Sequence, residues 1–176
     1  VMLAPNHCRP CDPMVLGRLA REARCLPHIM ASWHLFKQGR LQAWLLRHAG
    51  VFSVYREGLD RESLACAVRI LARGRRPLVL FPEGTRTSRD PVGPFTAAVA
   101  VVSRRTGVPV QAVFLEADSR YMGKGWSVLS NPRFPLGFRA RLGRRFDPPK
   151  DARAFTAELE SYFASELGGV PAKAQP

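Results

Sequence analysis

The chain has 176 residues, enough for one domain that buries a sizeable core, and its hydrophobic fraction of 46% argues against disorder. No apolar run approaches the ~20 residues that a membrane-spanning helix needs, so the chain as given is not expected to cross a bilayer. With 27 Lys and Arg against 14 Asp and Glu, the formal net charge of +13 favours an anionic partner: nucleic acid, anionic lipid headgroups, or a phosphorylated or acidic carrier substrate. Four irregularly spaced cysteines favour free thiols over a disulfide framework.

Short apolar runs alternate with stretches of helical periodicity along the chain. In chain order we expect a strand at 1–4, a helix at 12–26, a short strand at 28–32, a helix at 33–50, a strand at 51–55, a helix at 61–74, a strand at 77–81, a helix at 95–107, strands at 108–116 and 138–143, and a helix from Asp151. Residues 118–137, rich in Gly, Pro and Ser, predict a long loop or irregular hairpin.

These elements predict a single α/β domain with a mostly parallel sheet flanked by helices. The run PLVLF at 77–81 is continuously apolar, as in a parallel strand covered on both faces. In the last helix Phe155, Leu159, Phe163 and Leu167 step by four and predict one buried face. We expect the domain to span residues 1–167, with an N-terminal truncation before Val1 and a flexible tail at 168–176.

The stretch NHCRPCD at residues 6–12 carries two incompatible signatures. Cys8 and Cys11 form C-R-P-C, a pattern of thiol oxidoreductases, but the aromatic lead-in of such sites is missing, and a zinc site would lack a second pair of ligands. His7 and Asp12 instead offer a general base and the carboxylate that orients it, provided that the residues between them turn. Taken alone, this pair is more often a turn residue beside a helix cap.

Two further stretches leave the carboxyl ends of predicted strands, where α/β sheets place ligands. FPEGTRTS at 81–88 supplies the opposite charges of Glu83 and Arg86, with Gly84 allowing close approach to the backbone. GVFSVYR at 50–56 ends in Arg56, which could hold a phosphate, although many strand-end arginines are merely solvated.

Together, in this order and spacing, these stretches resemble the glycerolipid acyltransferase family. NHCRPCD resembles its N-H-x(4)-D block, GVFSVYR its G-x-[IF]-F-x-x-R block and FPEGTRTS its F-P-E-G-T-R-S block. GVPVQAVFL is similar to its V-P-[IV]-x-P-V strand, and FRARLGRRFDPP to its closing segment, so the resemblance covers about residues 1–150.

The resemblance implies an O-acyltransferase of phospholipid biosynthesis in which His7 deprotonates an acceptor hydroxyl and Asp12 fixes the imidazole. The matching positions that would bind the acceptor are Arg56, Glu83, Gly84, Thr85 and Arg86. The implied partners are an acyl-CoA or acyl-carrier-protein donor, a lysophospholipid acceptor and an anionic membrane surface, at the cytoplasmic face of the cell membrane. Neither a metal or redox cofactor nor nucleic acid is expected.

The sequence departs from the family pattern at two places. The third block usually continues into phenylalanine-lysine-x-glycine, whereas Thr96 and Ala98 stand at the lysine and glycine positions here. The fourth block, within GVPVQAVFL, ends Gln111-Ala112-Val113 without its internal proline. The resemblance implies 1-acylglycerol-3-phosphate as the acceptor. These departures leave open a lyso-ornithine lipid, glycerol 3-phosphate, or a non-catalytic, membrane-binding role as the alternatives.

Overall fold

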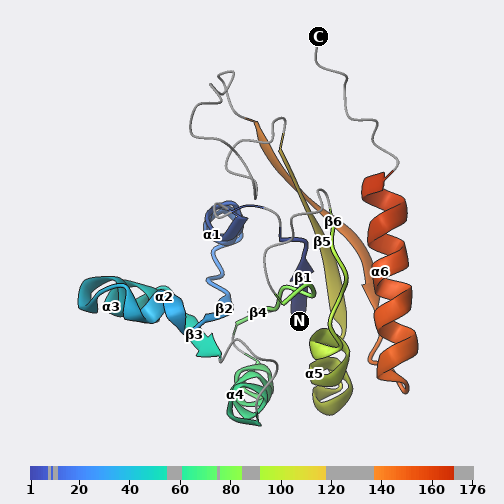
Figure 1. Cartoon of the computed structure of the whole chain (residues 1–176), viewed down its shortest axis with the longest axis horizontal. Coiled ribbons are helices and arrows are strands. Elements are labelled where there is room, and N and C mark those ends of the chain that lie inside the picture. The colour runs from blue at the N-terminus through green and yellow to red at the C-terminus, as the bar shows by residue number, and fades with distance from the viewer. Residues whose placement is uncertain are drawn as a thin grey trace.

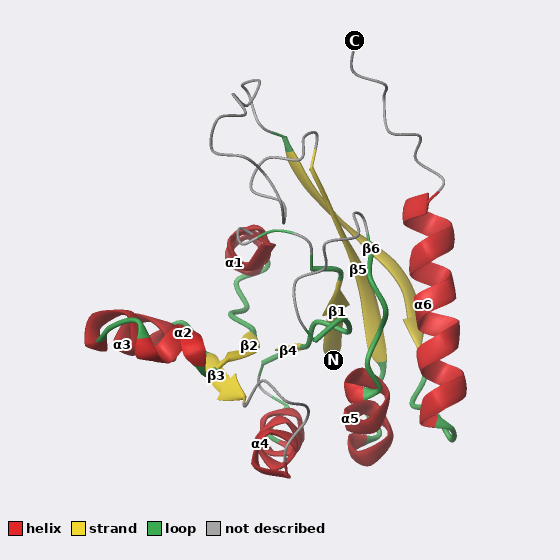
Figure 2. Ribbon diagram, viewed as in Figure 1, coloured by secondary structure: helices red, strands yellow, loops and turns green. Residues whose placement is uncertain are grey.

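The computed structural model describes residues 1–7, 9, 12–54, 61–74, 76–84, 92–117 and 137–168. Its strands are β1 (Met2–Pro5), β2 (His28–Ser32), β3 (Val51–Val54), β4 (Leu78–Val79), β5 (Val110–Ala117) and β6 (Phe138–Phe146). Its helices are α1 (Asp12–Glu22), α2 (His34–Lys37), α3 (Arg40–His48), α4 (Arg61–Ala72), α5 (Ala98–Thr106) and α6 (Ala152–Gly168), as Figures 1 and 2 show.

Within these residues the strands form one sheet in the order β3-β2-β4-β1-β5-β6. The first five strands run parallel, and β6 pairs antiparallel with β5 at the edge. β4 thus lies between β2 and β1, as expected for a strand whose apolar run shows no polar face. The predicted α/β fold with a mostly parallel sheet is confirmed.

Alternation along the strands divides the core between the two faces of the sheet. Met2 and Ala4 of β1 join the larger cluster, which lies against α4, α5 and α6. Leu3 packs with the smaller cluster on the opposite face, where Leu16 of α1 contributes. The predicted apolar face of the last helix is confirmed, because its four stepped side chains, Phe155, Leu159, Phe163 and Leu167, are all buried. Among the described residues no helix is both long enough and apolar enough to cross a membrane.

The expected single helix over residues 33–50 is wrong: two helices, α2 and α3, replace it. The break falls at Gly39, whose φ of 155° and ψ of 151° lie in a region open essentially to glycine alone. The helix expected from residue 95 begins only at Ala98 and ends, as predicted, before Gly107 in the left-handed conformation. The strand expected at 77–81 pairs over Leu78–Val79 alone.

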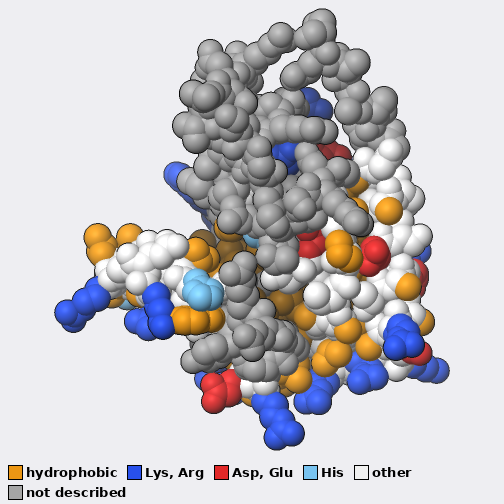
Figure 3. Space-filling view, viewed as in Figure 1, with side chains coloured by type: hydrophobic (Ala, Val, Ile, Leu, Met, Phe, Trp, Pro, Cys, Tyr) orange, Lys and Arg blue, Asp and Glu red, His pale blue; other side chains and the backbone are white. Residues whose placement is uncertain are grey.

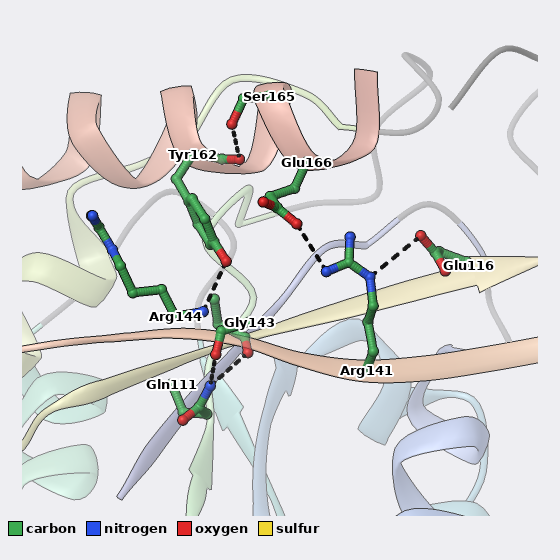
Figure 4. A network of polar contacts seen from close by, with 9 residues as sticks. Gln111, Glu116, Arg141, Gly143, Arg144, Tyr162, Ser165 and Glu166 are labelled. Atoms are coloured by element: carbon green, nitrogen blue, oxygen red, sulfur yellow. Dashed lines mark hydrogen bonds and ion pairs between the residues drawn. The ribbon is translucent and has the colours of Figure 1, made fainter. Parts of the chain in front are cut away.

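The pairing of β5 with β6 contains a bulge. The register runs from Gln111 opposite Arg145 to Val113 opposite Leu142, so β6 holds one more residue than β5 across this step. Side chains satisfy the backbone there, as Figure 4 shows: Gln111 Nε2 donates to the carbonyl of Gly143 (2.6 Å), and the Tyr162 hydroxyl accepts the N–H of Arg144 (2.9 Å). The bulge is therefore supported from both β5 and α6.

Candidate active site

The chain leaves β1 at the carboxyl edge of the sheet and turns at once into α1. His7 Nδ1 and Asp12 Oδ2 lie 3.0 Å apart. The same carboxylate oxygen accepts the backbone N–H of Arg9 at 2.8 Å, and the N–H of Asp12 donates back to the carbonyl of Arg9. This turn brings together two side chains five residues apart, which a straight helix would hold on different faces.

The contact between His7 and Asp12 fixes how the imidazole can act. A carboxylate only accepts hydrogen bonds, so with Asp12 ionised the hydrogen lies on Nδ1 and leaves a lone pair on Nε2. The side chain of Asp12 is 4% exposed, whereas that of His7 is 17% exposed and so remains partly open to solvent. The imidazole ring also packs on the ring of Phe81, with the two centroids 4.2 Å apart. Packing and hydrogen bonding thus orient a nitrogen base.

Glu83 reaches His7 from the end of β4, the strand next to β1. Its Oε1 accepts the backbone N–H of His7 at 3.0 Å, and the residue is buried. Gly84 follows at a φ of 68°, the left-handed conformation that favours glycine. The structure therefore brings four of the predicted site residues, His7, Asp12, Glu83 and Gly84, to one edge of the sheet.

Thr96, which departs from the family pattern, holds this loop. Its backbone N–H and its hydroxyl both donate to the carbonyl of Pro82, at 2.8 and 3.0 Å. A side chain on Gly84 would come within 3.3 Å of the Thr96 methyl group. Where the family pattern has lysine, this chain thus has a short side chain that clamps the turn carrying Glu83.

The remaining predicted binding residues, Arg56, Thr85 and Arg86, lie outside the described residues, as do Cys8 and Cys11. Cys25 and Cys66 are free thiols, as expected for these two positions. In the described part of the chain no three His, Cys, Asp or Glu side chains gather in a group that could hold a metal ion.

Two residues that belong to the site, Asn6 and Phe81, were absent from the sequence-based set. The Asn6 side chain is buried; its Nδ2 donates to the carbonyl of Leu115 at 3.0 Å, and its Oδ1 accepts the N–H of Leu115 at 2.7 Å. This amide extends the β1–β5 ladder past Pro5 and so holds the backbone next to His7. Asn6 lies in the motif NHCRPCD and Phe81 in the motif FPEGTRTS. Their positions inside these motifs were the signal that could have identified them as site residues.

A sequence profile of the family described as Acyltransferase matches residues 1–116. The chain belongs to the acyltransferase family. A relative within this acyltransferase group, the 1-acyl-sn-glycerol-3-phosphate acyltransferase of Streptococcus pneumoniae, is 27% identical over 138 residues, which cover 78% of this chain and 48% of that protein. The chain thus spans about half the length of this curated relative.

The acyltransferase fold recurs in a solved structure, that of the 1-acyl-sn-glycerophosphate (LPA) acyltransferase PlsC from Thermotoga maritima. The two chains superpose with a TM-score of 0.66 at 22% sequence identity, over 96% of this chain and 66% of that one. The similarity shows a shared fold, and the resemblance to glycerolipid acyltransferases drawn from the motifs is confirmed.

Proposed function

We propose that this chain transfers a fatty acyl group from a thioester of coenzyme A or acyl-carrier protein to the hydroxyl of 1-acylglycerol-3-phosphate. The observation that carries the proposal is the His7–Asp12 pair, with Nδ1 and Oδ2 3.0 Å apart at the carboxyl edge of the sheet. Membership of the acyltransferase family supports the reaction class, and the name of the pneumococcal relative supports the acceptor.

In the proposed reaction His7 acts as a general base through Nε2. It takes the proton of the acceptor hydroxyl while the oxygen attacks the thioester carbonyl. The tetrahedral intermediate then expels the thiolate, which recovers the proton from the imidazolium. An ester and a free thiol result, without an acyl-enzyme. The ionised Asp12 stabilises the imidazolium electrostatically while its hydrogen bond keeps the ring oriented.

The loop after β4 is proposed to form the acceptor side of the site. The Glu83 carboxylate would repel a phosphate, but its Oε1 is engaged by the N–H of His7, so we assign Glu83 to positioning the base next to the acceptor. Arg56 and Arg86 are proposed to hold the phosphate bidentately, and Gly84 and Thr85 to let it approach the backbone. Reaction at the cytoplasmic face of the cell membrane is part of the proposal.

The decisive experiment measures transfer of labelled acyl groups to detergent-dispersed 1-acylglycerol-3-phosphate by the wild-type chain and His7→Ala. Loss of the general base is expected to lower the rate roughly 10²- to 10⁴-fold. His34→Ala, which removes an exposed histidine of α2, is the matched control and should stay near wild type. A His7→Ala rate close to wild type would end the proposed mechanism.

The same assay separates the rival functions. Cys8→Ser and Cys11→Ser should leave transfer near normal, whereas a thiol–disulfide oxidoreductase would lose its function with either change. A wild-type chain that binds lipid without any turnover would point to a non-catalytic relative. Replacing the acceptor by a lyso-ornithine lipid or glycerol 3-phosphate tests the other acceptors directly.

A further inference from the structure

The helices α2 and α3 carry apolar side chains that the rest of the described chain leaves uncovered. Figure 1 shows the pair projecting from the body of the molecule beside β3, at the edge of the sheet opposite β6. On α3, Leu41 is 70% exposed, and Trp44 and Leu45 are each 52% exposed. We call these three residues the α3 stripe. A surface so rich in large apolar groups marks a binding site more often than a solvated face.

The α3 stripe lies on one side of its helix. Residues at positions i, i+3 and i+4 share a face, and at ~100° per residue that face points away from Ala43, the buried residue of α3. His48 continues the stripe one turn further on, with its ring 4.1 Å from that of Trp44. Ala43 therefore attaches the helix to the body, while the stripe faces outward.

The charge around the α3 stripe has a single sign. Residues 23–56 contain no Asp or Glu, whereas Lys37, Arg40 and Arg47 lie on or between the two helices and are exposed. Lys37 Nζ stands 3.9 Å from the ring centroid of Trp33, so this cation is held at the base of the pair. Figure 3 shows hydrophobic and basic side chains together on the projecting helices. Leucine and tryptophan flanked by Lys and Arg is the composition of helices that lie in the interface of anionic bilayers.

The helices α2 and α3 lie near the edge of the sheet that carries His7. β2, from whose end α2 begins, is parallel to β1 and separated from it by β4 alone. His34 and His7 therefore follow strands that end at the same edge of the sheet. A bilayer bound at α2 and α3 would lie beside the edge that carries the His7–Asp12 pair.

We propose that α2 and α3 dock this chain on an anionic bilayer, with the α3 stripe inserted among the acyl chains and Arg40 and Arg47 at the phosphate level. The purpose of this docking rests on the proposed function: it would bring the loop after β4 to lipids that are still embedded in a membrane. The binding itself is a property of the surface, and it is measured without turnover.

The test is co-sedimentation with phosphatidylglycerol–phosphatidylcholine vesicles and with phosphatidylcholine vesicles. The wild-type chain should bind the anionic vesicles more tightly, with an affinity that falls as salt rises. The triple variant Leu41→Gln, Trp44→Gln, Leu45→Gln keeps good helix formers and should lose about a hundredfold in vesicle affinity. Arg40→Gln should weaken binding to anionic vesicles alone. Leu142→Gln, which replaces a 69% exposed leucine on β6, is the control for losing an exposed leucine outside the α3 stripe, and should bind as wild type.

Activity assays then separate this inference from the proposed function. The triple variant should keep transfer to a monomeric short-chain acceptor and lose transfer to the same headgroup embedded in vesicles. Wild-type affinity of the triple variant for vesicles would overturn the docking proposal, whether or not the chain proves to be an acyltransferase. So would a wild-type dimer that the triple variant converts to monomer, because the stripe would then be covered by a second copy.

Discussion

The side-chain amide of Asn6 offers the sharpest test of how the fold holds the edge of the sheet that carries His7. Asn6→Ala removes both hydrogen bonds to Leu115 and leaves a buried backbone N–H and a buried carbonyl without that partner. Each buried group that loses its partner costs about 1–3 kcal/mol, so we expect the free energy of unfolding to fall by about 3 kcal/mol. With a typical domain stability of about 5–15 kcal/mol, the variant should still fold.

Urea denaturation followed by circular dichroism measures this loss, and acyl transfer measures its effect on the site. Asn6→Asp should also destabilise: its carboxylate still accepts the Leu115 N–H, but it replaces the donor to the buried Leu115 carbonyl by a second acceptor. Gln42→Ala removes an amide whose hydrogen bond to Gln38 is exposed, so it serves as control and should change stability by less than about 0.5 kcal/mol.

The activity of folded Asn6→Ala should fall as well, since the backbone that carries His7 loses its anchor on β5. If Asn6→Ala loses no more stability than Gln42→Ala, the amide does not hold β1 against β5. Full activity in a destabilised variant would show instead that the anchor serves folding and not the orientation of His7.

Two further predictions concern stability. Gly143→Ala would place a methyl group directly against Cε2 of the buried Phe114 and 2.9 Å from the Tyr162 hydroxyl, and should cost about 1–3 kcal/mol in urea unfolding. Gly17 lies within α1, and a Cβ added there would meet no atom within 4 Å, so Gly17→Ala should instead stabilise by up to about 1 kcal/mol. If both variants changed the free energy of unfolding in the same direction, the packing argument would be contradicted. Asp151 caps the start of α6: hydrogen bonds from the backbone N–H of Ala154, and next from that of Arg153, hold the pKa of its carboxyl below the ordinary value of 3.8. The ionised carboxylate therefore stabilises the fold above that pH, and this stabilisation is lost as the pH falls through the lower folded pKa. Asp151→Ala should therefore lower Tm at neutral pH, and the difference from wild type should vanish in strong acid; a difference that persists there would contradict the assignment.

Hydrophobic periodicity predicted most of the helices and strands, because the positions that each element buries repeat along its own sequence. Four side chains of α6 at steps of four, beginning at Phe155, are enough to define its buried face. The break between α2 and α3 escaped prediction because the apolar spacing continues across Gly39, and one glycine inside a helical pattern is usually tolerated. Its backbone conformation, which spacing does not encode, ends the helix.

In the candidate site, too, contacts between residues close in sequence could be predicted, whereas contacts between distant residues could not. The pairing of His7 with Asp12 could be inferred from a short turn, since only four residues lie between them. The contact from Glu83 to the N–H of His7 spans 76 positions, and that from Asn6 to Leu115 spans 109. Such contacts depend on which strands are neighbours in the sheet, and no local pattern reveals that β4 and β5 flank β1.

Glu83 accepts a hydrogen bond from the backbone N–H of His7 and not from its side chain, and this has a practical consequence. Every residue except proline offers the same N–H, so the link between β1 and the loop after β4 does not depend on the imidazole. Asp12 likewise keeps the backbone N–H of Arg9 when the ring is gone. A chain without the His7 side chain should thus keep the backbone contacts of Glu83 and Asp12 while turning over roughly 10²- to 10⁴-fold more slowly. Such a variant is a suitable reagent for capturing the proposed donor and acceptor together in one complex.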